Sequence, residues 1–101
     1  MDFVTGLIEQ FVTDAPALVG DARAGIEAGD PAAVRRAAHT LKSNSATFGA
    51  SALAERARQL EETARRGSLD EARALFQAVS DQVDIVRDSL PTIWTRMSAA
   101  R

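Results

Sequence analysis

The chain has 101 residues, 46% of them hydrophobic and 26% charged, so we expect one domain over residues 1–101 with a core of about 3–90. Its net charge of −2 excludes a general attraction to nucleic acid or anionic membranes, because phosphate binding needs a concentrated basic surface. The absence of cysteine excludes disulfides and thiolate metal sites. Since no apolar run approaches the ~20 residues that cross a bilayer, we expect a cytoplasmic protein.

Helical periodicity begins near Phe3 and continues to about Ala28. Its expected inward positions are Phe3, Leu7, Phe11, Leu18, Ala22 and Ile26. Pro16 interrupts this stretch, and Asp14 is a suitable N-cap for a helix with Pro16 in its first turn. The pattern predicts either a short helix followed by a longer one or a single bent helix.

Gly29, Asp30 and Pro31 provide a helix stop, an N-cap and a first-turn proline in succession. The next helices are expected at about 31–47 and 51–66, before Gly49 and Gly67 respectively. Because the connections are short, neighbouring helices should be antiparallel.

The last helix should begin after Ser68, which forms a capping-box pattern with Glu71. Its apolar seam consists of Leu69, Ala72, Phe76, Val79, Val83, Val86, Leu90, Ile93 and Met97. A dimeric coiled coil has a similar seam, but a domain of this size favours a bundle core. Pro91 should kink or end the helix, leaving 91–101 as a short helix or tail. The expected fold is all-α: an antiparallel four-helix bundle with a short extra N-terminal helix and a C-terminal helical extension.

His39 is the only histidine, and helical geometry turns it away from the core. The core direction of its helix is set by Val34, Ala38, Leu41, Ser45 and Phe48. At 3.6 residues per turn, His39 lies about 140° from that direction. Lys42 and Arg35 lie on the same flank, together with the small residues Ser43 and Ala46. An isolated surface histidine is usually inert, so this pattern alone makes His39 only a candidate.

Glu61 lies on a flank of the same sign in the next helix, as do Arg58 and Arg65. Flanks of equal sign in an antiparallel hairpin either face each other or both face away, and the sequence leaves the handedness open. If they face each other, Glu61 can fix the tautomer of His39 and aim its other nitrogen as a nucleophile. With the charge of Lys42 nearby, the arrangement would suit phosphoryl transfer.

The run AAHTLKSNSATFGASALAERARQLE resembles the signature of histidine-containing phosphotransfer domains, the HPt modules of two-component phosphorelays. That family typically has histidine, a variable residue, an apolar residue, lysine and a small residue, followed by small residues, an apolar position and glycine. The matching positions are His39, Leu41, Lys42, Ser43, Ser45, Ala46, Phe48 and Gly49.

The resemblance implies that His39 carries the phosphoryl group, that Lys42 supports it electrostatically, and that Glu61 stands where relatives place Gln or Glu near the ring. Ser43 departs from the commonest residue, glycine, and slightly narrows a partner's approach to His39. Ala46 is small and leaves that approach open. The implied partners are receiver domains of response regulators or hybrid histidine kinases, which exchange phosphate through an aspartate. A monomer without cofactor or metal is the expectation.

The chain is expected to be a phosphoryl carrier rather than an enzyme with its own ATP site. Gly20 and Gly25 have P-loop spacing, but Ile26 and Glu27 stand where lysine and serine or threonine are needed. One histidine with scattered carboxylates does not make a transition-metal site.

Three alternatives compete with this interpretation. The dimerisation domain of sensor kinases usually has an acidic residue after its histidine and a proline five positions on, where this chain has Thr40 and Asn44. The HPt-like domain of a chemotaxis-type kinase has nearly the same local motif. A non-catalytic helical adaptor would bind partners through exposed apolar residues of the first helix, such as Val4 or Ile8.

Overall fold

A computed structural model of the chain contains four helices: α1 (Phe3–Ala28), α2 (Pro31–Thr47), α3 (Ser51–Arg65) and α4 (Leu69–Ala99). The structure describes the backbone of residues 3–47 and 50–99 and the side chains of residues 6, 8–47 and 50–89. The all-α fold and the four-helix bundle are therefore confirmed. Within the described residues, no helix combines the length and apolar character needed to cross a membrane.

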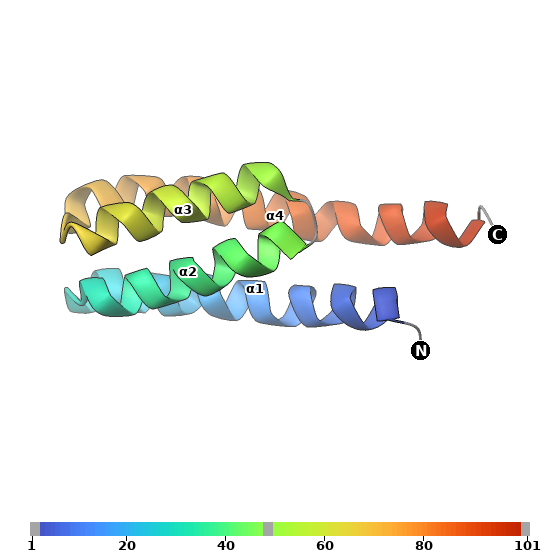
Figure 1. The fold of residues 1–101 in the computed structure, drawn as a ribbon, viewed down its shortest axis with the longest axis horizontal. Coiled ribbons are helices and arrows are strands. Elements are labelled where there is room, and N and C mark those ends of the chain that lie inside the picture. Colours follow the sequence, from blue (N-terminus) through green and yellow to red (C-terminus); the bar gives the residue numbers. More distant parts are fainter. Residues whose placement is uncertain (1–2, 48–49, 100–101) are drawn as a thin grey trace.

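The helices form a ring in which each packs against two others, α1 and α3 each lying against both α2 and α4. Helices that follow one another in the chain run in opposite directions (Figure 1). With 31 residues α4 is much longer than the 17-residue α2, and its C-terminal part extends past the last turn of α2 and the first turn of α3 (Figure 1). The four inward faces enclose one core.

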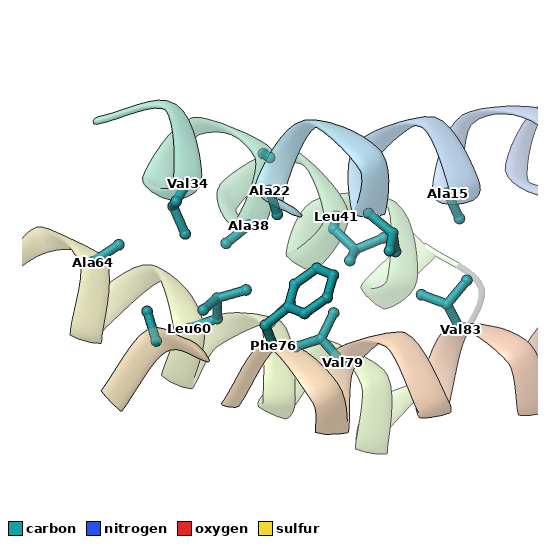
Figure 2. Close-up of a cluster of buried hydrophobic side chains, with 14 of the residues drawn as sticks. Ala15, Ala22, Val34, Ala38, Leu41, Leu60, Ala64, Phe76, Val79 and Val83 are labelled. Atoms are coloured by element: carbon teal, nitrogen blue, oxygen red, sulfur yellow. The ribbon is translucent and has the colours of Figure 1, made fainter. Parts of the chain in front are cut away.

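The core is built from small and medium side chains. Its buried hydrophobic residues are Phe11, Ala15, Val19, Ala22, Ile26, Val34, Ala37, Ala38, Leu41, Leu53, Ala57, Leu60, Ala64, Ala72, Phe76, Val79 and Val83. Phe76 points from α4 into the space between the helices, while alanines line much of the opposite surface (Figure 2). The alanines let the helices approach closely, and burial of this apolar surface is the main term that stabilises the bundle.

The predicted inward positions whose side chains are described either lie in the core or pack against it. Leu18, Leu69 and Val86 are partly buried and pack against the core rather than lying within it. Ala15 and Val19 are buried although the sequence analysis did not place them inward. The predicted core positions that lie outside the described side chains are Phe3, Leu7, Phe48, Leu90, Ile93 and Met97.

The junction between α1 and α2 has the predicted form. Gly29 has a positive φ of 69°, and the Asp30 N–H donates to the carbonyl of Gly25 at 2.8 Å, which closes the end of α1. The Asp30 carboxylate then accepts a hydrogen bond from the Ala33 N–H at 3.2 Å and caps α2. Gly67 ends α3 in the same way, with a φ of 79°.

At Pro16 the single helix, one of the two predicted forms, is found, and at Pro91 the predicted end of the helix is not. Pro16 lies inside a continuous α1, so there is no separate short N-terminal helix and Asp14 is an interior residue. Buried Ala15 and Val19 hold α1 against the core on both sides of Pro16, and this packing outweighs the ~3 kcal/mol that an interior proline costs. Likewise α4 continues through Pro91 to Ala99, because a proline removes one helical hydrogen bond without having to stop the helix.

Gly25 allows α1 and α2 to approach closely near their junction. A Cβ atom built on Gly25 would lie 2.8 Å from Cγ2 of Val34 and 3.1 Å from its backbone nitrogen. Val34 is fully buried. The contact fixes α2, the helix that carries His39, against α1.

Candidate functional site

The buried face of α2 determines where His39 points. This face comprises Val34, Ala37, Ala38, Leu41 and Ser45. The Ser45 hydroxyl donates to the Leu41 carbonyl at 2.7 Å, so a polar side chain is accommodated in the core. His39 lies on the opposite flank with 60% of its side chain exposed, which confirms the outward orientation predicted from the helical wheel.

Glu61 on α3 joins the two candidate side chains of α2. Its Oε2 lies 2.7 Å from Nδ1 of His39, and its Oε1 accepts a hydrogen bond from Nζ of Lys42, also at 2.7 Å. The flanks of α2 and α3 therefore face each other, which resolves the handedness that the sequence left open. One carboxylate connects the imidazole and the ammonium group.

Glu61 is the least exposed member of this group, with 19% of its side chain accessible against 33% for Lys42. Partial burial raises the pKa of Glu61, but the hydrogen bonds from Lys42 and His39 together outweigh it and lower the pKa below 4.5. Glu61 is therefore ionised at neutral pH and can only accept hydrogen bonds. Nδ1 of His39 must then carry the hydrogen, which leaves the lone pair of Nε2 free when the ring is neutral.

The side chains around His39 are small or charged. Ser43 and Ala46, the small residues predicted beside it, are both exposed, as is Arg35. Arg58 and Arg65 on α3 each donate to a glutamate three residues earlier in the chain. With His39 60% exposed and small side chains next to it on α2, a partner surface can reach the imidazole.

One contact in this site was not predicted from the sequence. Glu61 was expected to pair with His39 alone and Lys42 to have a separate role, whereas Glu61 is bonded to both. The signal was present in the helical wheels, because Lys42 and Glu61 each fall about 80° from the core direction on flanks of the same sign.

Two further features bear on the alternatives. Ile8, expected as an exposed contact of an adaptor, is partly buried and packs against the core, while Val4 lies outside the described side chains. Within the described residues, no three His, Cys, Asp or Glu side chains are grouped so as to hold a metal ion.

Comparison with known proteins gives two matches. A family model described as "Hpt domain" matches residues 6–89. The crystal structure of histidine-containing phosphotransfer protein B (HptB) from Pseudomonas aeruginosa PAO1 is similar, with a TM-score of 0.84, 37% sequence identity and coverage of 89% of this chain and 78% of that one. No match was found among curated proteins.

Proposed function

Because the chain belongs to the Hpt family, whose members act in phosphotransfer in two-component signalling, we propose that it is a phosphorelay intermediate working through His39. In this proposal Nε2 of His39 accepts a phosphoryl group from the aspartate of a receiver domain and passes it to another receiver, or runs the reverse. The observation that carries the proposal is the 2.7 Å contact between Nδ1 and Glu61, which leaves Nε2 as the available nucleophile.

In the accepting step, the Nε2 lone pair forms a bond to phosphorus while the bond from phosphorus to the aspartyl oxygen breaks and returns its electrons to the carboxylate. The hydrogen on Nδ1 stays in place, so the ring gains positive charge. Glu61 lies where it compensates that charge, and Lys42 supplies a positive group close to the transferred phosphoryl group. Reversal of the same step releases the phosphoryl group to the next aspartate.

The chain needs only to aim a nucleophile, because the receiver's acidic pocket and its divalent cation organise the in-line transfer. We therefore propose a carrier that uses no ATP site of its own. Its partners would be receiver domains of response regulators or hybrid kinases, and it would meet them in the cytoplasm as a monomer.

The test is to incubate the protein with a receiver domain that carries a labelled aspartyl phosphate. Label should move to the protein, should be acid-labile, and should be absent from the His39→Gln variant. Because His39 is the only histidine of the chain, acid-labile label has no other imidazole to occupy. Thr40→Ala, a change at the neighbouring exposed position, is the matched control and should accept label normally. Label that survives in His39→Gln would overturn the proposal.

A further inference from the structure

Most cations around His39 are already paired with carboxylates. Lys42 donates to Glu61 at 2.7 Å, and Arg58 and Arg65 donate to glutamates of their own helix at 2.6 Å each. Arg35 is also exposed on this side of the bundle, yet it has no ion pair with any residue that the structure describes. Arg35 is therefore available on this side of the site for a group from outside the chain.

Helix geometry places Arg35 beside His39. The two residues are four apart on α2, so they are neighbours on one face, about 5–6 Å apart at their Cβ atoms. Side chains on a helix lean toward its N-terminus, so the imidazole leans over the turn that carries Arg35. A partner surface that reaches Nε2 of His39 therefore comes within reach of the Arg35 guanidinium.

Arg36 provides a comparison within the same helix. It is exposed and also has no ion pair among the described residues, but it lines the groove between α1 and α2, on the other flank from Glu61. The two arginines thus share helix, charge and exposure and differ in the face they occupy. Arg36, three residues before His39, is also its neighbour, but it lies on the side of the α1–α2 groove, whereas Arg35 lies on the side of Glu61.

We infer that Arg35 is a docking residue that pairs with a carboxylate on the surface of the incoming receiver domain, an inference that rests on the proposed function. The chain has a net charge of −2, which opposes the approach of an acidic pocket. An unpaired guanidinium one turn from His39 supplies local attraction and fixes the orientation of approach, as charges at the rim of an interface do. The partner feature is an aspartate or glutamate rather than the phosphoryl group, which the proposed function assigns to Lys42.

The experiment compares wild type, Arg35→Ala, Arg35→Lys and Arg36→Ala. Each is first labelled on His39 with phosphoramidate, a small donor that transfers its phosphoryl group to the imidazole and releases ammonia. Transfer is then measured to the receiver domain that reacts fastest with wild type, at ionic strengths of about 0.1 M and about 1 M, where the screening length falls from about 10 Å to about 3 Å.

Arg35→Ala should lower kcat/KM for transfer about two- to fivefold at low salt, the range typical of an exposed ion pair. Arg36→Ala should lose clearly less than Arg35→Ala, because Arg36 lies on the far side of His39 from Glu61. Arg35→Lys should recover most of the loss, and the loss should shrink at high salt. Equal transfer by Arg35→Ala and wild type, an equal loss in Arg36→Ala, or an undiminished loss at high salt would each overturn the inference. So would slower labelling of Arg35→Ala by phosphoramidate, since that donor has no protein surface.

The outcomes also separate this inference from the proposed function. If neither phosphoramidate nor a phosphorylated receiver labels His39, the proposed function is wrong. If His39 is labelled and transfers normally in all four proteins, the relay assignment stands and only the role of Arg35 is wrong.

Discussion

Two glycines of α1 offer a matched test of how closely α1 and α2 are packed. Gly25 and Gly20 both lie in the interior of the same helix, and alanine is favoured over glycine in such positions by about 1 kcal/mol. A Cβ on Gly20 would have no atom within 4 Å, so Gly20→Ala should increase the free energy of unfolding by about 0.5–1 kcal/mol.

Gly25→Ala gains the same helix propensity but meets α2. The new Cβ would lie 2.8 Å from Cγ2 of Val34, 3.1 Å from the Val34 nitrogen and 3.2 Å from Cβ of Ala33. The last two atoms belong to the α2 backbone or are fixed directly to it, so the contact is relieved only if the helix moves. Overpacking of this kind costs about 1–3 kcal/mol. Since propensity cancels between the two variants, Gly25→Ala should be less stable than Gly20→Ala by about that amount.

The assay is thermal unfolding of both variants and wild type, followed by circular dichroism. For a domain of this size, 1 kcal/mol corresponds to about 4–8 °C in Tm, so Gly25→Ala should melt at least about 4 °C below Gly20→Ala. Equal melting temperatures would refute the reasoning, because they would mean that α2 moves away from α1 at no cost.

Three further predictions concern the site and the core. Lys42→Ala should slow transfer from a receiver about tenfold, because one charge-assisted contact is lost. It should lower the free energy of unfolding by only about 1 kcal/mol, since the ion pair is partly exposed. Unchanged transfer kinetics would show that Lys42 has no role in transfer. The pKa of Glu61 is lowered from 4.5, so its stabilisation is fully present above about pH 4.5 and is lost as pH falls through the folded-state pKa. In urea titrations the stability gap between wild type and Glu61→Gln should therefore narrow in acid, and a gap independent of pH would contradict this. Leu60 is fully buried, so Leu60→Ala should lower the free energy of unfolding, measured in urea, by about 2–5 kcal/mol. A loss below about 1 kcal/mol would mean that the core closes the cavity left by the leucine.

Local signals in the sequence predicted the helix junctions well. Gly29, Asp30 and Pro31 act within a few residues of one another, and the closing bonds at Gly29 and Asp30 depend on no distant part of the chain. The outward orientation of His39 could also be predicted, because the apolar face of α2 and the helical period determine it.

The features that the sequence did not determine depend on packing between helices. Pro16 has the same local signature whether a helix ends there or continues, and burial of Ala15 and Val19 on both sides of it favours continuation. To predict the pairing of Glu61 with His39, one must know the handedness of the α2–α3 hairpin. No single residue of either helix determines that handedness.

His39, Lys42 and Glu61 all come from one helical hairpin, with Glu61 only 22 positions after His39. A single short exchange between genes would transfer the whole constellation, while substitutions in α1 and α4 change only the support beneath it. The proposed chemistry therefore depends on a contiguous segment of about 23 residues, His39 to Glu61, and α1 and α4 contribute to it only through packing.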